Sequence, residues 1–292
     1  MLPTLNQVTA GGGLLLPDYV ALAARHGFHG VEFSIGAVAK SVEQIGFPAT
    51  AAIFESHKVL PASFGLPVEW RKDEETFARD LEALPALAKL AQDLDCSRCC
   101  TWVLPDSGEP VAQYAERSSR RLADASAILQ SEGVRLGLEF LGPQHFRKNP
   151  DNVWFYDIPG AVQVVAQISQ LRDLENLGLL VDAWHWYTSG GTTMDLASIP
   201  IEQIVHVHIN DAPDLPVADQ VDSVRLLPGE SGVIDIVGFL KTLDAIGYDG
   251  PLAVETFSAE LKTLPPDEAA ARAGAAVSKV LSLAAIEPLR LQ

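Results

Sequence analysis

Residues 204–211 read IVHVHIND, a run of apolar residues that is interrupted by two histidines and followed by an asparagine and an aspartate. Two similar runs lie at 177–182 (LGLLVD) and 251–257 (PLAVETF), and each carries an acidic residue at or near its end. Short apolar runs of this kind are typical of parallel strands that helices cover on both faces. The three runs therefore predict a parallel sheet in an α/β protein.

The same alternation of short apolar runs and longer helical patterns extends along the whole chain. Eight strands are expected, at Thr4–Thr9, Gly30–Ser34, Leu60–Phe64, Cys99–Leu104, Arg135–Phe140, Gly178–Asp182, Ile204–Ile209 and Leu252–Phe257. Helices are expected at Pro17–Arg25, Ser41–His57, Asp73–Leu94, Val111–Ser131, Pro159–Leu171, Met194–Ile199, Asp235–Ile246 and Pro266–Ala284. The segment 73–94 shows the helical pattern clearly, because its apolar residues form one stripe: Phe77, Leu81, Leu84, Leu87, Ala88 and Ala91.

Eight strand–helix units in 292 residues predict a single (β/α)8 TIM barrel that spans residues 1–292. A doubly wound sheet is the alternative, but no GxGxxG motif follows the first strand, and the glycines at 11–13 are expected to form a flexible turn. The segments 141–158 and 210–231 are long for loops that follow strands. Because long loops in compact domains tend to be functional, both are candidates for the active-site face.

The charge balance argues against some classes of partner. Lys and Arg number 21 and Asp and Glu 38, so the formal net charge is −17, which disfavours nucleic acid and anionic membrane surfaces. The first residues show no signal-peptide pattern and no apolar run reaches about 20 residues, so a soluble cytoplasmic protein is expected. The three cysteines all lie within 96–100, too close for a disulfide framework, and are expected to be packing residues.

Acidic residues and an imidazole stand at the ends of four consecutive predicted strands. They are Glu139, Asp182, His208 and Glu255. In a TIM barrel the carboxyl ends of the strands meet at one mouth, where these charges would repel each other unless a divalent cation joined them. We therefore expect them to bind one divalent metal ion, and Mn²⁺, Zn²⁺, Co²⁺ and Mg²⁺ all suit this ligand set. His206 shares a strand face with His208 and is expected to pack in the core or to support the ligand.

Further candidates surround this cluster. His185 follows Asp182 by three residues, and as a neutral imidazole it could hydrogen-bond a substrate oxygen. Trp184 and Trp186 could wall a sugar ring or merely pack in the core. Arg225 lies before a Pro-Gly turn, has no evident acidic partner in the sequence, and could bind hydroxyl or phosphate oxygens or lie on the surface. Glu32 ends the second strand as either a substrate contact or a support for the metal ligands.

The segments LEF, VDAWH, HVHIND, RLLPGESGVID and VETF, in this order, resemble the xylose-isomerase-like superfamily of sugar isomerases and epimerases. Within it, the chain is most similar to the 2-keto-myo-inositol isomerase branch, from the LNQVT first strand to the ETFSAELKTLPPDEAA tail. The resemblance implies a metal ion held by Glu139, Asp182, His208 and Glu255, with His185 and Arg225 touching the substrate. It also allows a homodimer. The related endonuclease IV enzymes carry additional histidines on earlier strands, and the ends of LPASFG and CCTWVLP have none.

The expected function is that of a metal-dependent isomerase or epimerase of a small ketose or keto-cyclitol, acting through an enediolate. Glu139 and Glu255 are the expected acid–base pair, and the expected partner is a small sugar or cyclitol substrate. Two alternatives remain open: a lyase of the inosose dehydratase type and a barrel that binds metal or sugar without turnover. The same residues serve isomerisation, epimerisation and dehydration, so the sequence leaves the choice among them open.

Overall fold

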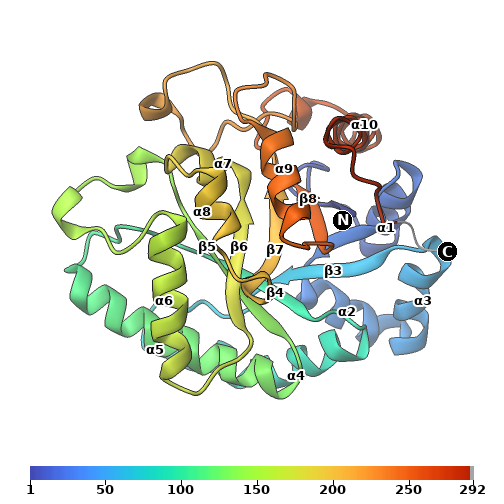
Figure 1. Cartoon of the computed structure of the whole chain (residues 1–292). Helices are drawn as coiled ribbons and strands as arrows, with labels where there is room; N and C mark the ends of the chain where they lie inside the picture. Colours follow the sequence, from blue (N-terminus) through green and yellow to red (C-terminus); the bar gives the residue numbers. More distant parts are fainter. Residues whose placement is uncertain (290–292) are drawn as a thin grey trace.

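A computed structural model describes residues 1–289, and in it eight parallel strands form one closed barrel in sequential order (Figure 1). Each strand pairs with the next, and β8 closes the barrel against β1. The strands are β1 Leu2–Leu5, β2 Gly30–Phe33, β3 Leu60–Gly65, β4 Arg98–Val103, β5 Arg135–Phe140, β6 Leu177–Asp182, β7 Ile204–Ile209 and β8 Pro251–Val254. The expectation of a (β/α)8 TIM barrel is confirmed.

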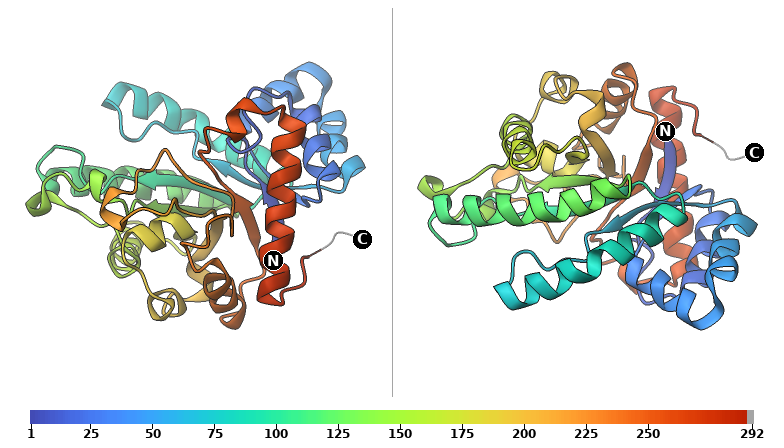
Figure 2. Two further views of the ribbon diagram at one scale, coloured as in Figure 1. Left: turned by 90° about the horizontal axis from the view of Figure 1, so that it is seen from above. Right: turned by 90° about the horizontal axis from the view of Figure 1, so that it is seen from below.

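Helices surround the barrel: they form a ring around its strands in Figure 1, and Figure 2 shows the same arrangement from above and from below that view. They are α1 Leu16–Arg25, α2 Ile35–Ile45, α3 Phe47–His57, α4 Glu74–Asp93, α5 Val111–Ser131, α6 Ile158–Gln170, α7 Ala183–Thr188, α8 Thr193–Ala197, α9 Ile236–Ala245 and α10 Pro266–Ala284. In α4 the predicted stripe faces inward: four of its six residues are buried and the other two pack partly against the core. The backbone N–H of Leu289 donates to the carbonyl oxygen of Met1 (2.8 Å), which holds the end of the described chain beside its beginning.

Two helices differ from expectation. The single helix expected at Ser41–His57 is broken at Gly46, whose φ of +82° is incompatible with a continuous right-handed helix. Pro48 then lies in the first turn of α3, where its missing N–H costs no hydrogen bond. The short helix α7 was not expected, because its six residues are mostly aromatic. It begins directly after Asp182, whose side chain accepts a hydrogen bond from the backbone N–H of Trp184 (2.6 Å).

The first and last strands end earlier than expected, which places two polar residues at the barrel mouth. β1 ends at Leu5, because the side chain of Asn6 accepts a hydrogen bond from the backbone N–H of Val8 and turns the chain. β8 ends at Val254, so Glu255 lies at the rim just beyond it. Glycines 11–13 all have positive φ, as the expected turn requires.

Alternation along the strands separates the barrel interior from its outer face. Cys100, Leu180 and Val205 form a small buried cluster inside the barrel. Gly137 completes this layer, because an added Cβ there would lie 3.2 Å from the Cys100 sulfur. All three cysteines are buried and unpaired, so the expected packing role is confirmed. Two positions further along β4, β5 and β6 lie Trp102, Glu139 and Asp182, which point into the mouth. In β7 the register shifts between Ile204 and His206, so that His206 and His208 face the mouth.

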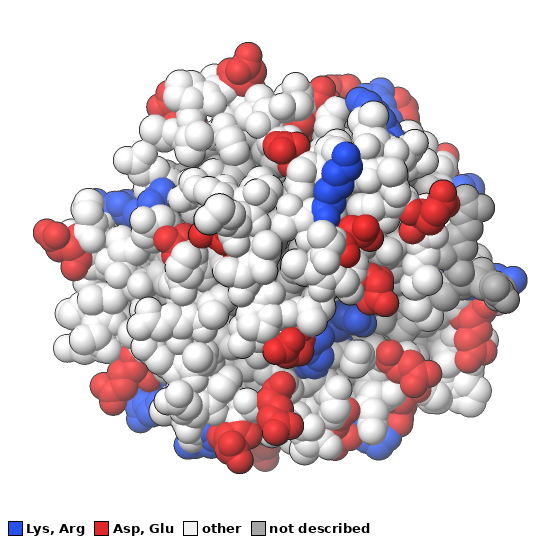
Figure 3. Space-filling view, viewed as in Figure 1, with Lys and Arg blue, Asp and Glu red and all other residues white. Residues whose placement is uncertain are grey.

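Among the described residues, no helix has both the length and the apolar character needed to cross a lipid bilayer. On the face drawn in Figure 3, acidic side chains are spread over the surface and basic ones stand between them as separate spots. This face therefore presents mixed charge and no continuous basic surface.

Candidate metal and substrate site

The four residues expected to bind a metal ion meet at the mouth of the barrel. The Nδ1 atom of His208 lies 3.7 Å from Oε1 of Glu139, 3.6 Å from Oδ2 of Asp182 and 3.4 Å from Oε2 of Glu255. One donor atom from each residue lies within 4.8 Å of all the others, and Glu139, Asp182 and His208 are buried. Parallel pairing of β5 to β8 brings these strand ends together, which is why consecutive strands supply the set.

Two atoms of this cluster lack a hydrogen-bond partner. Oε1 of Glu139 and Nδ1 of His208 are both buried, and neither is hydrogen-bonded within the described chain. Buried polar atoms are normally paired, because an unpaired one loses its hydration without compensation. Three carboxylates and one imidazole are a suitable donor set for a divalent transition metal. The residues therefore fit the ion that the sequence predicted.

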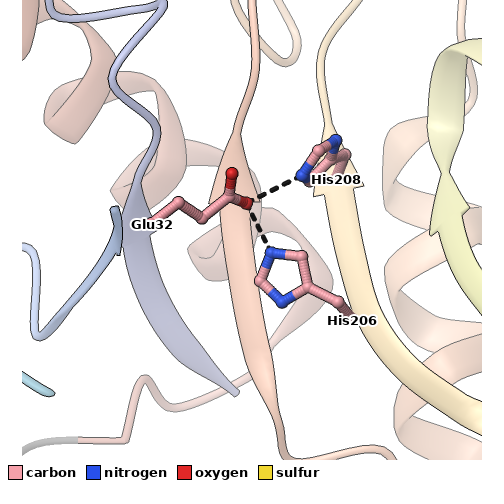
Figure 4. A group of neighbouring side chains, drawn as sticks. All are labelled: Glu32, His206 and His208. Atoms are coloured by element: carbon pink, nitrogen blue, oxygen red, sulfur yellow. Dashed lines mark hydrogen bonds and ion pairs between the residues drawn. The ribbon is translucent and has the colours of Figure 1, made fainter. Parts of the chain in front are cut away.

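Glu32 of β2 fixes the orientation of His208 (Figure 4). Its Oε1 lies 2.7 Å from Nε2 of His208 and 2.5 Å from Nε2 of His206, and Nδ2 of Asn6 donates to its Oε2 (2.6 Å). A carboxylate at Nε2 keeps the proton on that nitrogen and leaves Nδ1 free as a ligand. Of the two roles expected for Glu32, this geometry favours support of a metal ligand. Glu32, His206 and His208 could themselves bind an ion, but their facing atoms are already paired with one another.

Arg225 is not free of acidic partners, contrary to the expectation from the sequence. Its Nη1 donates to Oδ2 of Asp182 (2.8 Å) and to Oε2 of Glu255 (2.5 Å), and its Nη2 donates to Oδ1 of Asp222 (2.6 Å). The pairs with Asp182 and Glu255 could not be found in the sequence, because they join segments that are 43 and 30 residues apart. Asp222 lies only three residues before Arg225 and was overlooked. When all three carboxylates are ionised, Glu139, Asp182 and Glu255 together with one guanidinium retain an excess of two negative charges, which one divalent cation would balance.

Asp211 folds the loop that carries Arg225. Its carboxylate accepts four backbone N–H groups, those of Ala212, Ser231, Gly232 and Ile234, at 2.7–3.0 Å. Its backbone also pairs with Leu226 through two hydrogen bonds of 2.9 and 2.8 Å. These contacts close the loop 210–231 at its base and place Arg225, next to Leu226, over the carboxylates. The loop is long, but these contacts fix its conformation, and it can therefore place the buried guanidinium of Arg225 at the cluster.

The charges of the cluster favour the binding of either additional protons or a metal cation. Burial raises the pKa of Glu139 to about 8, and the nearby carboxylates of Glu255 and Asp182 add to this effect. Burial also acts to raise the pKa of Asp182, but the charge of Arg225 outweighs it and holds that pKa well below its usual range. Burial acts to lower the pKa of His208, but the carboxylates of Glu32 and Glu255 outweigh it and raise that pKa well above its usual range.

His185 lies in the first turns of α7 and is completely buried. Its Nδ1 accepts a hydrogen bond from the backbone N–H of Gly142 (3.2 Å), and its Nε2 lies 3.7 Å from Oε1 of Glu139. Glycine is required at 142, because a Cβ there would lie 2.3 Å from the carbonyl oxygen of His185. Burial and the neighbouring Arg225 lower the pKa of His185 well below its usual range, so the ring is neutral, as expected.

Trp184 and Trp186 lie on α7, and the structure buries both rings. Trp184 is 0% exposed, and Nε1 of Trp186 donates to the carbonyl oxygen of Thr192 (3.0 Å) while its ring packs against Phe239 (5.2 Å between centroids). Neither ring lines an open wall of the mouth, so of the two roles considered for them the geometry favours packing in the core. The reason is the unexpected helix, which turns these positions toward the core.

Trp102 is an exposed aromatic residue at the mouth that was not predicted from the sequence. It is 42% exposed and lies directly opposite Glu139 in the pairing of β4 with β5. Its position could have been found from strand alternation, because Trp102 follows the inward-facing Cys100 by two residues. The mouth thus combines a buried acidic cluster with one exposed indole.

Comparison with known proteins identifies the family. The family model of the xylose isomerase-like TIM barrel matches residues 20–281. The chain belongs to this family. A solved xylose isomerase domain protein from Alicyclobacillus acidocaldarius has the same fold, with a TM-score of 0.86, 30% sequence identity and coverage of 98% of this chain and 99% of that one.

Two curated relatives are enzymes. The inosose isomerase of Bacillus velezensis is 24% identical over 266 residues, which cover 90% of this chain and 91% of that protein. The 3-dehydroshikimate dehydratase of Pseudomonas aeruginosa is 31% identical over 196 residues, which cover 65% of this chain but only 28% of that longer protein. The family and its enzymes confirm the expectation of an enzyme of the sugar isomerase and epimerase type.

The raised pKa of Glu139 predicts a pH dependence of folding stability in metal-free protein. A carboxyl group whose pKa rises from 4.5 to about 8 on folding stabilises the fold fully below pH 4.5, and this contribution is lost as the pH rises toward 8. Glu139→Gln removes the ionisation, so its free energy of unfolding should rise relative to wild type between pH 5 and 8. Urea unfolding with chelator present measures this. The exposed Glu82→Gln serves as control, and parallel curves for wild type and Glu139→Gln would contradict the prediction.

Glu32→Gln should weaken metal binding, because the amide is a poorer acceptor for Nε2 of His208 and leaves its tautomer less well fixed. Loss of such a supporting carboxylate typically lowers metal affinity about 10- to 100-fold. Titration of Zn²⁺ or Mn²⁺ against a chromophoric chelator gives the dissociation constant. An affinity equal to that of wild type would show that Glu32 has no supporting role.

Proposed function

We propose that this protein is a divalent-metal-dependent isomerase or epimerase of a small ketose or keto-cyclitol, such as an inosose. The observation that carries this proposal is the group of four converging donors, two of whose atoms are buried and unpartnered. Its place at the strand ends of a xylose isomerase-like barrel supports the assignment, since TIM-barrel enzymes carry their chemistry there. The similarity to an inosose isomerase over nine-tenths of the chain supports the substrate class.

We assign Glu139, Asp182, His208 and Glu255 as the ligands of one divalent ion. Mn²⁺, Zn²⁺, Co²⁺ and Mg²⁺ all remain compatible with three carboxylates and an imidazole. When bound, such an ion would polarise a substrate carbonyl, acidify the adjacent C–H and stabilise an enediolate. Within the chain, Asn210 holds Asp182 in place through a hydrogen bond to its Oδ1 (2.9 Å), and Glu32 does the same for His208.

Glu139 and Glu255 are proposed as the residues that move the proton. They come from β5 and from the end of β8, so they approach a bound ketone from different directions. One carboxylate would take the proton from the carbon beside the carbonyl. Its return to the neighbouring carbon gives isomerisation, and its return to the other face of the same carbon gives epimerisation. His185 is neutral, and its two ring nitrogens lie 3.2 Å from the backbone N of Gly142 and 3.2 Å from Nη2 of Arg225; it would help Arg225 to hold a substrate oxygen beside Glu139.

A dehydratase is the second candidate, and the relationship to the 3-dehydroshikimate dehydratase favours keeping it. The same base would remove the same proton, but a hydroxyl group on the next carbon would leave as water. Product analysis separates the two reactions, because only dehydration produces a new double bond and a change in ultraviolet absorption.

Metal binding should raise the thermal stability of the protein. Removing the ion leaves Glu139, Asp182 and Glu255 to repel one another, and a ligand at 100 times its dissociation constant adds about 2.7 kcal/mol. We expect EDTA to lower the melting temperature, and Mn²⁺ or Zn²⁺ to restore it in wild type but not in a Glu139→Ala, Glu255→Ala double variant. Elemental analysis of protein purified without chelator gives the metal content. Protein without metal that shows no shift on metal addition would contradict the proposal.

Glu139→Gln and Glu255→Gln should each lower kcat at least about 100-fold while some metal remains bound, because each removes a basic group but keeps one oxygen ligand. The combined loss should be far smaller than the product of the two, since either one stops the same proton transfer. Exchange of solvent deuterium into candidate ketoses and inososes, followed by NMR, measures the reaction. A metal-loaded Gln variant with wild-type turnover would show that the residue is not part of the acid–base pair.

A further inference from the structure

One side of the barrel mouth carries arginines without acidic partners. Arg71 lies between β3 and α4, and Arg147 lies between β5 and α6. Because β4 lies between β3 and β5 in the barrel, these two segments flank the end of β4. Within residues 1–289 neither guanidinium has a carboxylate at ion-pair distance, whereas Arg225 has three. The mouth of the described chain therefore has its carboxylate cluster along β5 to β8 and two arginines without carboxylate partners beside β4.

Arg71 is held rigidly but keeps unused donors. Its Cζ lies 3.5 Å from the centroid of the Trp102 ring and 4.4 Å from that of Trp70. Its Nη2 donates to Oγ1 of Thr101 (2.9 Å) and to the carbonyl oxygen of Trp102. Nη1 has no partner in the described chain and neither does the buried Nε, so three of the five N–H groups are unused. Burial lowers the pKa of Arg71 to about 10, which still leaves it charged at neutral pH.

The exposed ring of Trp102 stands between the carboxylate cluster and a free space at the end of β3. Trp102 pairs with Glu139 across β4 and β5, so its exposed ring lies beside a proposed metal ligand. On the other side, Gly65 at the end of β3 is exposed, and a Cβ added there would meet no atom within 4 Å. Arg71 and Trp102 thus form a shelf, which we call the Arg71–Trp102 shelf, at the edge of an open mouth.

We propose that the Arg71–Trp102 shelf binds a carboxylate group of the substrate, so that among the polyhydroxy ketones of the proposed function the enzyme prefers those that carry an acid group. This inference rests on the proposed function, because it places the ketone at the acidic cluster and the carboxylate at the shelf. A planar guanidinium with unused donors matches a carboxylate in geometry and charge. In a protein of net charge −17, an anionic substrate needs such a local cation to overcome the general repulsion.

Calorimetric titration of the full-length, metal-loaded protein tests this with two ring ketones. They are 3-dehydroshikimate, which carries a carboxylate, and 2-keto-myo-inositol, which is neutral. Wild type should bind 3-dehydroshikimate at least tenfold more tightly. Arg71→Gln should weaken that binding about 10- to 100-fold, the value of a charged hydrogen bond, and change binding of the neutral ketone less than twofold. Arg172→Gln, which alters an exposed arginine paired with Asp124, is the matched control and should change neither.

Arg71→Lys provides a second variant, because it keeps the charge if Arg71→Gln fails to fold. It should retain a preference for the carboxylated ketone but bind it several-fold more weakly than wild type. Equal loss for both ketones, or tighter binding of the neutral one by wild type, would overturn the inference. Binding is measured separately from proton exchange. If the enzyme exchanges protons of neutral ketones and Arg71→Gln does not change the affinity for either ketone, the shelf proposal alone is overturned. If the affinity for the carboxylated ketone depends on Arg71 but neither ketone exchanges protons, only the proposed isomerase activity is overturned.

Discussion

Mutual repulsion among Glu139, Asp182 and Glu255 is the constraint on which the rest of the site depends. Their carboxylates face one imidazole nitrogen at 3.4–3.7 Å in a largely buried setting, where like charges cannot be left uncompensated. The chain supplies one guanidinium, that of Arg225, and the remaining excess of negative charge fits a divalent ion. The unpartnered atoms of Glu139 and His208 show that the protein alone does not satisfy this cluster.

Other parts of the fold serve to hold these charges in position. Glu32 reaches across the mouth from β2 and fixes the imidazole of His208, while Asp211 closes the loop that delivers Arg225. Gly142 lets the chain after β5 pass close to α7, which holds His185 near Glu139. Each contact joins two strands or loops of the barrel, so the site is a property of the closed barrel and not of any one segment.

Charged groups are distributed unequally around the mouth, and this distribution would orient a bound substrate. Carboxylates gather on β5 to β8, and arginines without acidic partners flank β4. A substrate with a ketone at one end and a negative group at the other would fit this division in only one orientation.

The sequence by itself determined the barrel and the convergence of the four candidate metal ligands, because both follow from local patterns. Apolar runs of strand length predict buried parallel strands, and Glu139, Asp182, His208 and Glu255 could be placed together because parallel strands end at the same face. Contacts between distant segments could not be predicted from the sequence. The support of His208 by Glu32 depends on closure of the barrel, which brings β2 opposite β7. The pairing of Arg225 with Asp182 and Glu255 and the stacking of Arg71 on Trp102 depend on how loops fold over the mouth. For Trp184 and Trp186 the sequence left packing and a substrate wall both open, and the fold of α7 decided for packing. Side chains in loops have no fixed periodicity, so only the tertiary structure decides which of them meet.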